Sequence, residues 1–355
     1  MRIACVAYLH GAGGAERQII MLANNLARQG ENVSLIVMVD FKSKFPIYKD
    51  VNVIDLTYCE KEKGNKIVNR FRALRKVYRE ISPQVTIHYW LQSAYLSTMM
   101  SSKLAGKIIY SERGDPSDSE YSGLLGVVRS LAFRRIQGFV FQSKGAEDYF
   151  SDSIKKRAIV IPNPISVPEG EYITPCKNRS KKIVNIGRLH PQKNQTLLIE
   201  AFSRMSASFS EYSLEIFGDG DLKEELTDKI KKLNLSNRVF LKGTTMNIYD
   251  EMYDASLFVL SSDFEGMPNA LMEAMALGVP CVSTDCRPGG ARALIQDGKN
   301  GFIVPIGNID CLTAAMERAL EYDEIDSMCK MAQKIRLTHS ENAVFAKWKE
   351  YIYSV

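Results

Sequence analysis

Short β-branched segments alternate with amphipathic segments along the whole chain, and this alternation constrains the fold more than any other feature. Residues 3–7 and 33–39 have strand character, and residues 15–29 between them place apolar side chains three and four positions apart. Strands that are each followed by a helix form parallel sheets, because a parallel pair needs a long crossover connection. The sequence therefore predicts an α/β protein with doubly wound parallel sheets.

The alternation stops once, at a proline-rich segment, and then starts again. Pro162, Pro164, Pro168 and Pro175 are too dense for central strands, since proline donates no ladder hydrogen bond. A chain of 355 residues is also long enough for two domains. We therefore expect domains at residues 1–165 and 166–340, followed by a C-terminal helix at 341–355. The predicted strands are 3–7, 33–39, 51–56, 85–89, 107–111, 139–142 and 158–161, then 182–186, 213–217, 239–241, 257–260, 281–283 and 302–304.

Composition excludes several classes of protein. With 45% hydrophobic and 25% charged residues the chain is neither disordered nor collagen-like. The seven cysteines include no C-x-x-C pair, which excludes a zinc knuckle and a thioredoxin-type redox pair. No apolar run approaches about 18 residues, and the N-terminus has no signal-peptide pattern, so we expect a cytoplasmic protein.

The charge is unevenly distributed. Residues 1–165 carry 24 Lys and Arg against 15 Asp and Glu, whereas the remainder carries 22 against 26. The densest basic stretch, Lys61 to Arg79, has apolar residues at helical spacing, which predicts an amphipathic helix with a cationic face. Such a helix can lie on an anionic membrane, or its apolar stripe can pack on its own domain while the cations are solvated. Nucleic acid is disfavoured, because the aromatic interleaving of nucleic-acid motifs is missing.

A glycine-rich turn follows the first strand. Gly11 and Gly13 fit a dinucleotide-binding fingerprint, and Asp40 ends the second strand where a ribose-binding acid would lie, but Glu16 occupies the third glycine position. The turn predicts either a phosphate-binding helix start or an ordinary tight turn.

Two motifs in the second half predict binding sites: one contains two basic residues and the other contains two acidic residues. Arg188 and Lys193 flank a helix expected to begin near Lys193, which favours an anion such as a diphosphate; two solvated cations are the alternative. Glu265 lies in a loop at a strand's carboxyl end, and Glu273 lies in the apolar helix predicted between Pro268 and Gly278. A buried carboxylate needs a partner, so Glu273 indicates a polar ligand or an ion pair.

Three further features of the sequence contain titratable side chains. Asp219 and Asp221 favour a turn with Asp221 capping the next helix over a metal site, because a divalent ion needs more oxygen ligands. Glu112 and Arg113 end a strand of the first half and are candidates for binding an acceptor or a phosphate. His88 is predicted to be a packed core histidine.

These motifs occur in one order that is similar to a known family. The residues are GGAER at 13–17, IPNPI at 161–165, GRL at 187–189 with Lys193, GDG at 218–220, and Glu265 with Glu273. Together they resemble the retaining glycosyltransferases of family 4 (glycosyl transferases group 1), which have the GT-B fold: two Rossmann-like domains facing across a cleft. The resemblance implies that the last helix, with Trp348 and Tyr351, packs back on the first domain.

The resemblance also implies roles for individual residues. Arg188 and Lys193 would hold the donor diphosphate, Glu273 the ribose and Glu265 the transferred sugar, with Glu265, Arg188 and Lys193 as the catalytic set. The remaining donor-binding residues would be Gly13, Gly14, Gly266, Met267 and Asn269. No cofactor and no metal are expected. Many relatives have histidine where this chain has Arg113, and an arginine stays charged, so acceptor or phosphate binding suits it better than base catalysis.

The implied reaction is a retaining transfer of a hexose or N-acetylhexosamine, UDP-linked, to a glycan such as a polyprenyl-diphosphate-linked or other lipid-linked saccharide. The basic half would be the acceptor side, peripheral on the inner face of the plasma membrane. Three alternatives stay open: a dinucleotide-dependent oxidoreductase using Gly11, Gly13 and Asp40, a sugar-nucleotide epimerase of the same architecture, and a non-catalytic sugar-nucleotide-binding protein.

Overall fold

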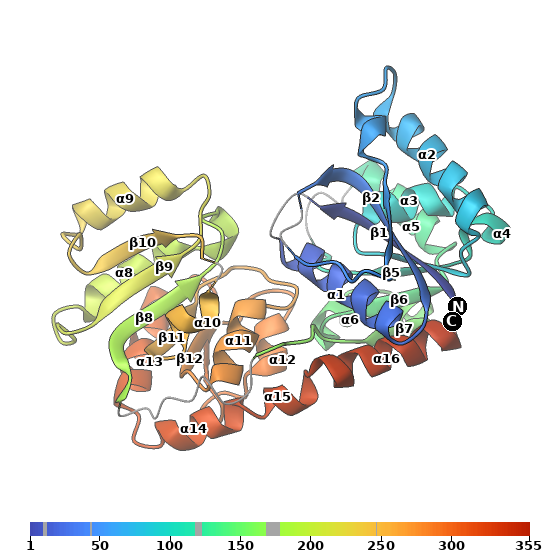
Figure 1. Ribbon diagram of the computed structural model, residues 1–355. Helices are drawn as coiled ribbons and strands as arrows, with labels where there is room; N and C mark the ends of the chain where they lie inside the picture. Colours follow the sequence, from blue (N-terminus) through green and yellow to red (C-terminus); the bar gives the residue numbers. More distant parts are fainter. Residues whose placement is uncertain (10–12, 43–44, 118–122, 168–177, 246) are drawn as a thin grey trace. The chain divides into compact units, whose positions relative to one another are not determined.

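The computed structural model describes residues 1–9, 13–42, 45–117, 123–167, 178–245 and 247–355 (Figure 1). Their contacts divide the chain into two compact units. Unit 1 comprises Met1–Pro164 with Glu341–Val355, and unit 2 comprises Ile165–Ser340. The predicted domain limits, 165/166 and 340/341, lie within one residue of this partition.

Unit 1 is built on a parallel seven-stranded sheet in the order β3-β2-β1-β4-β5-β6-β7. The register pairs Ile3 with Val33 on one side of β1 and with Val85 on the other. The strands are β1 (Arg2–Leu9), β2 (Asn32–Phe41), β3 (Asn52–Asp55), β4 (Val85–His88), β5 (Lys107–Ser111), β6 (Gly138–Phe141) and β7 (Ala158–Val160).

Helices cover both faces of this sheet, because side chains alternate along each strand. Ile3 and Cys5 of β1 pack in the core with α1 (Gly14–Arg28) and α16 (Glu341–Ser354), whereas Ala4 and Val6 pack with the helices of the opposite face. The remaining helices are α2 (Lys66–Ile81), α3 (Leu91–Thr98), α4 (Ser102–Ala105), α5 (Gly123–Phe133), α6 (Lys144–Asp148) and α7 (Asp152–Lys155), with the 3-10 turn η1 (Thr57–Glu60).

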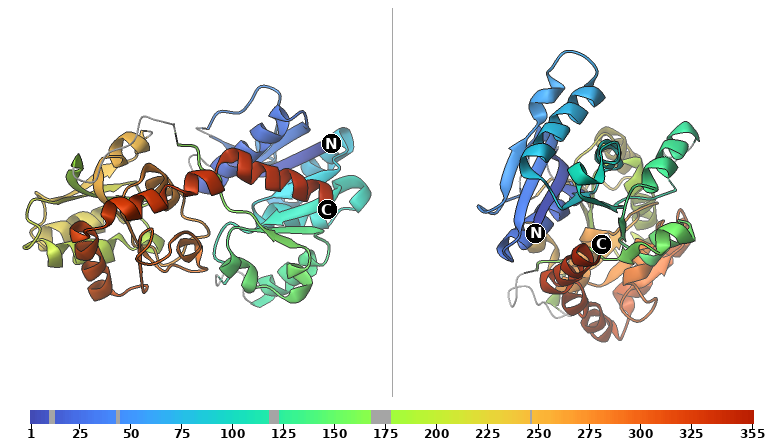
Figure 2. Two further views of the ribbon diagram at one scale, coloured as in Figure 1. Left: turned by 90° about the horizontal axis from the view of Figure 1, so that it is seen from below. Right: turned by 90° about the vertical axis from the view of Figure 1, so that its right-hand side faces the viewer.

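Helix α16, from the far end of the chain, is part of unit 1 and lies along it in Figure 2. Trp348 is 1% exposed, and the Tyr351 hydroxyl accepts from the Phe139 amide at 2.8 Å. Glu31 ties both chain ends to the same corner, since it accepts from the Met1 ammonium at 2.5 Å and from the Tyr353 hydroxyl at 2.6 Å. The helix therefore completes the core of a unit whose other residues lie some 180 positions earlier in the sequence.

Unit 2 has a parallel six-stranded sheet in the order β10-β9-β8-β11-β12-β13. Its order reverses between β8 and β11, where Ile183 pairs with Leu257. The strands are β8 (Ser180–Ile186), β9 (Ser213–Phe217), β10 (Val239–Gly243), β11 (Ala255–Leu260), β12 (Cys281–Thr284) and β13 (Phe302–Val304).

Unit 2 also carries helices on both faces. Ile183 of β8 lies in the core with α8, α9 and α13, and Val184 lies in the core with α11 on the opposite face. The helices are α8 (Gln195–Met205), α9 (Lys223–Lys232), α10 (Ile248–Met252), α11 (Asn269–Leu277), α12 (Gly290–Leu294), α13 (Ile309–Glu321), α14 (Ile325–Ala332) and α15 (Ile335–Thr338).

Every predicted strand is present, but three helix ends differ from the prediction. α8 begins at Gln195 instead of near Lys193, because Asn194 is left-handed (φ 46°) and its side chain accepts from the Leu197 amide at 3.2 Å. The predicted Asp221 cap is wrong: α9 starts after Leu222, and no side chain caps it. Pro268 precedes α11 instead of lying in its first turn, whereas Gly278 ends that helix in the left-handed conformation (φ 70°), as expected.

Candidate functional site

Two loops of unit 2 form the candidate site: residues 187–194, which follow β8, and residues 261–268, which follow β11. These strands are neighbours at the point where the strand order of the sheet reverses. Ligands of open parallel sheets bind outside the carboxyl ends of the strands at this position, since the loops there diverge to opposite faces. The topology therefore brings the two predicted motifs to one place.

Hydrogen bonds fasten the two loops to each other. The Asp263 amide donates to the Gln192 carbonyl at 2.9 Å, and the Gln192 side-chain amide donates to the Phe264 carbonyl at 2.8 Å. The Asn194 side chain donates to Asp263 Oδ1 at 2.9 Å, and the Ser261 hydroxyl donates to the Lys193 carbonyl at 2.8 Å. These contacts fix the backbone on both sides of Lys193.

Glycine permits a third loop to pack against the first. A Cβ on Gly218, at the end of β9, would lie 1.9 Å from the Gly187 carbonyl oxygen, and Gly218 has φ +142°. A Cβ on Gly220 would lie 2.4 Å from the Leu189 carbonyl oxygen. The GDG motif at 218–220 is therefore explained by close backbone approach to the loop that carries Arg188.

Lys193 and Glu265 meet at the centre of the site. The Lys193 ammonium forms an ion pair with Glu265 Oε1, and the Ser262 hydroxyl donates to the same oxygen at 2.7 Å. The Lys193 side chain is 19% exposed and that of Glu265 is 10% exposed. The Glu265 backbone is held as well, since its amide donates to the Arg287 carbonyl at 2.6 Å.

Helix α11 begins directly after this pair. Its first amide groups lack intrahelical acceptors and form the positive end of the helix dipole. Gly266 and Met267, before the helix, are buried, and a Cβ on Gly290 would lie 2.4 Å from the Gly266 carbonyl oxygen. Asn269 is the first helical residue. Glu273 lies one turn later, is 6% exposed and has an interaction partner.

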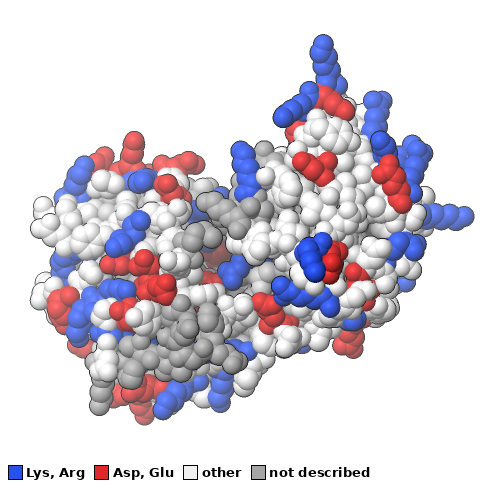
Figure 3. Space-filling view, in the orientation of Figure 1, with Lys and Arg blue, Asp and Glu red and all other residues white. Residues whose placement is uncertain are grey.

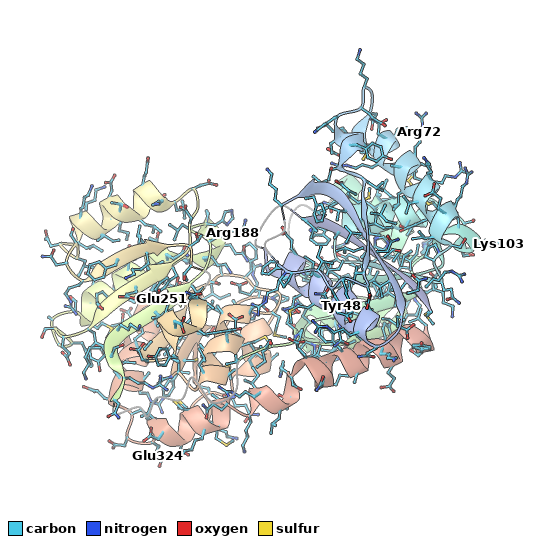
Figure 4. The ribbon with its side chains drawn as sticks, viewed as in Figure 1. Tyr48, Arg72, Lys103, Arg188, Glu251 and Glu324 are labelled. Atoms are coloured by element: carbon cyan, nitrogen blue, oxygen red, sulfur yellow. The ribbon has the colours of Figure 1, made fainter. Side chains whose placement is uncertain are left out.

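Arg188 differs from Lys193 in that none of the described residues holds its guanidinium. The residue is exposed at the end of β8 (Figure 4), and only its carbonyl is engaged, by the Gln195 side chain at 2.9 Å. Within the described ranges its side chain has no hydrogen bond or ion pair. It is therefore available to bind an anion.

The glycines of the N-terminal motif belong to unit 1. Gly13 is the N-cap of α1 and Gly14 its first residue, and both are exposed. Their amides lie at the positive end of a 15-residue helix, as an anion site would require. Gly11 and the side chain of Asp40, on which the dinucleotide alternative rests, lie outside the described residues.

Glu112 and Arg113 are engaged with their own unit. Glu112 is 4% exposed and accepts from the Tyr110 hydroxyl at 2.9 Å and from the amides of Arg113 and Gly114 at 3.1 Å. Burial raises the pKa of this carboxyl group. The carboxylate therefore organises its own loop.

The Arg113 guanidinium lies 3.7 Å from the centroid of the Tyr89 ring and 5.9 Å from that of Trp348 in α16. Its Nη1 donates to Asn163 Oδ1 at 2.7 Å, in the predicted IPNPI connector. Arg113 therefore joins three segments that are distant in sequence. The sequence did not indicate this packing role, because it depends on Tyr89 and Trp348, neither of which is near Arg113 in the chain.

A basic surface on unit 1 is formed by α2 and α4. Figure 3 shows Lys and Arg side chains gathered there, and Figure 4 labels Arg72 and Lys103 pointing outward. Of the predicted apolar stripe, Leu74 and Tyr78 are buried in the unit, whereas Ile67 is 61% exposed. Most of the stripe thus packs on its own domain, and the exposed cations of α2 and α4 include Lys66, Arg72, Arg75, Lys76, Arg79 and Lys103.

His88 is buried and its Nδ1 lies 2.9 Å from the Ser93 hydroxyl, so it is the packed core histidine that the sequence predicted. Within the described residues no three His, Cys, Asp or Glu side chains gather in a way that could hold a metal ion. None of the described helices is both long and apolar enough to cross a membrane.

Several site residues were not singled out from the sequence. Ser261, Ser262 and Asp263 directly follow the apolar strand β11, and this change from apolar to polar residues at a strand's carboxyl end is a usable signal. Gln192 and Asn194 carried no such signal. Their roles depend on the second loop, which lies about 70 positions later in the chain.

Comparisons with known proteins agree with the family that the sequence motifs resemble. The model of the family described as glycosyl transferases group 1 matches residues 173–336. The N-acetylgalactosamine-N,N'-diacetylbacillosaminyl-diphospho-undecaprenol 4-alpha-N-acetylgalactosaminyltransferase of Campylobacter jejuni is 30% identical over 93% of this chain and 93% of its own. An uncharacterized glycosyltransferase of Methanocaldococcus jannaschii is 31% identical over 65% of this chain, and the match spans 63% of that relative's length.

Solved structures show the same fold. The Anabaena protein HepE, in complex with UDP and glucose, superposes with a TM-score of 0.80 at 19% identity, covering 100% of both chains. At this identity the likeness concerns the fold, and it confirms the predicted class of two Rossmann-like α/β domains.

Proposed function

Because this chain belongs to the group 1 glycosyltransferases, we propose that it moves a hexose or N-acetylhexosamine from a UDP-linked donor to a lipid-linked saccharide. The observation that carries the proposal is the contact between Lys193 and Glu265, which joins two loops where the strand order of unit 2 reverses, with Arg188 exposed on the first of these loops. Nucleotides bind at such positions in parallel sheets.

The donor assignment rests on charge and on one structural relative. Arg188 and Lys193 together match the charge of a diphosphate, and an arginine can bind two of its oxygens at once. The relative HepE was solved with UDP and glucose. In the proposed site Glu273 binds the ribose hydroxyls, and the backbone around Gly266, Met267 and Asn269 surrounds the sugar and the β-phosphate. Gly13 and Gly14, at the start of α1, complete the proposed set of donor-binding residues.

The proposed reaction retains the configuration at the anomeric carbon. The acceptor hydroxyl attacks on the face from which the diphosphate leaves, and a diphosphate oxygen accepts the hydroxyl proton as the C–O bond to the leaving group breaks. Arg188 and Lys193 stabilise the negative charge that grows on the leaving group, and Glu265 positions the sugar. These cations supply the charge compensation, so no cofactor or metal is proposed.

The acceptor assignment rests on the activity of the Campylobacter relative, which acts on an undecaprenol-linked diphospho-saccharide. Such an acceptor is anchored in a bilayer. We therefore propose that the basic surface of α2 and α4 lies on the anionic inner face of the plasma membrane, each cation contributing about 1 kcal/mol. Ile67 and Val68 add exposed apolar contact at the same surface.

The central test measures UDP release from a panel of UDP sugars with and without a polyprenyl-diphosphate-linked saccharide. Release that depends on the acceptor, with the product retaining the donor's anomeric configuration, is the expected result.

Lys193→Ala should lower turnover at least about 100-fold, because it removes a charge that stabilises the leaving group. The exposed Lys299→Ala is the matched control and should keep full activity. Release without acceptor that yields an epimerised donor, or donor binding with no turnover, would instead support the alternatives.

Membrane contact is tested by co-sedimentation with vesicles of anionic or neutral phospholipid. The native protein should sediment mainly with anionic vesicles, and Arg72→Glu with Arg75→Glu should reduce this binding at least about tenfold. Equal binding to neutral vesicles would contradict the electrostatic contact.

A further inference from the structure

The cation assigned to the donor diphosphate already has a partner. Lys193 is paired with Glu265, and both side chains are largely shielded from solvent. A carboxylate this close to a lysine compensates its charge, and it would repel a diphosphate brought to the same ammonium. Arg188 is not compensated in this way.

The Glu265 carboxylate has a second hydrogen-bonding partner besides Lys193. The Ser262 hydroxyl donates to Oε1 at 2.7 Å, and Ser262 is completely buried. The Ser262 carbonyl accepts in turn from the Thr284 hydroxyl at 2.5 Å, which ties the loop to β12. Ser262 is thus held by a contact that involves neither Lys193 nor Glu265.

We propose that Lys193 exchanges Glu265 for the donor diphosphate when substrate binds, and that Ser262 is the positioning residue that holds the Glu265 carboxylate toward the sugar after the exchange. The proposal rests on the function proposed above. The exposed Arg188 meets the diphosphate without breaking any contact, and Lys193 joins it only when the ion pair opens.

The exchange is tested by calorimetric binding of inorganic pyrophosphate and of UDP, neither of which carries a sugar that Glu265 could contact. Glu265→Gln should tighten binding of both about tenfold, because Lys193 no longer has to leave a charged partner. In the Lys193→Met background the same change should have at least about fivefold less effect. If Lys193 bridges the carboxylate and the anion without exchange, Glu265→Gln acts equally in both backgrounds, which would overturn the proposal.

The role of Ser262 is tested with Ser262→Ala. This variant should lower kcat about tenfold and leave the Kd for UDP within about twofold, since the hydroxyl acts on the carboxylate and not on the diphosphate. Ser283→Ala is the matched control, because Ser283 is equally buried but donates to the Thr284 carbonyl at 2.8 Å. Equal losses of kcat in the two variants would assign Ser262 a merely structural role.

The outcomes separate this proposal from the proposed function. If the protein binds UDP and transfers sugar, but the effects of Glu265→Gln and Lys193→Met are additive, the proposed function stands and the exchange is ruled out. If neither the native protein nor the Glu265→Gln variant binds pyrophosphate or UDP, both the proposed function and the exchange are ruled out.

Discussion

His88 shows how burial, acting on one residue, creates a dependence of stability on pH. The imidazole is fully buried at the end of β4, and its Nε2 has no hydrogen-bond partner among the described residues. Burial disfavours the charged form and lowers the pKa of His88 to about 3. The unfolded chain, with a pKa near 6.5, therefore binds the proton first as the pH falls.

Stability should consequently decline on acidification. Between about pH 6.5 and pH 3 the unfolded state binds more protons at this site, so this group lowers the free energy of unfolding by about 1.4 kcal/mol for each pH unit lost; above about pH 6.5 this loss is absent. Urea unfolding at pH 7 and pH 5 should show a smaller pH effect in His88→Gln than in the native protein. Ser93→Ala removes the hydrogen bonds of this hydroxyl with His88 Nδ1 and with the Trp90 carbonyl but keeps the buried imidazole, so it should keep the native pH effect. A His88→Gln variant with an unchanged pH effect would contradict the assignment.

At the scale of elements, strands were predictable and loop conformations were not. The strands follow from runs of β-branched residues, a local property, and all of them lie where the sequence placed them. The start of α8 was misplaced because Asn194 turns into the left-handed region, where its side chain caps the helix and also reaches Asp263. The contact with Asp263 comes from another loop and cannot be inferred from neighbouring residues.

The close packing of the loops after β8 and β9 makes Gly218 a sensitive position. Gly218→Ala should destabilise the protein by at least about 2 kcal/mol, because the new Cβ would meet the Gly187 carbonyl and the backbone conformation is strained for any other residue. Gly298→Ala is the control: it also has a positive φ (+72°), but nothing lies within 4 Å of its Cβ, so only about 1 kcal/mol is expected. Urea unfolding of both variants measures the difference. Equal losses would show that the close approach has no energetic effect.

At the scale of the whole molecule, the chain returns to its first unit at the end. α16 brings Trp348 into the unit 1 core, where its ring centroid lies 6.1 Å from that of Tyr89. Trp348→Ala should therefore cost about 3–5 kcal/mol through the cavity it leaves. The exposed Lys347→Ala on the same helix should change stability by less than about 0.5 kcal/mol. An equal unfolding free energy for Trp348→Ala and the native protein would mean that the helix is not part of the unit's core.

The division of charge between the halves also belongs to this scale. The first half is basic by composition, but only the folded chain decides which cations share a surface. α2 buries Leu74 and Tyr78 and exposes Arg72 and Arg75. Arg113, which the sequence placed among possible ligands of an acceptor, lies instead against Tyr89 and bonded to Asn163.

The sequence by itself determined the two Rossmann-like domains, their proline-rich connection and the motifs that hold Arg188, Lys193, Glu265 and Glu273, because each depends on local periodicity, turn chemistry or residue spacing. Only the tertiary structure decided that Lys193 is paired with Glu265, that Ser262 shares the carboxylate and that Arg188 is exposed. Those facts depend on two loops that are separated by some 70 residues and meet only because β8 and β11 are neighbours in the sheet. Contacts of that kind come from sheet order, which the alternation of strands and helices does not specify.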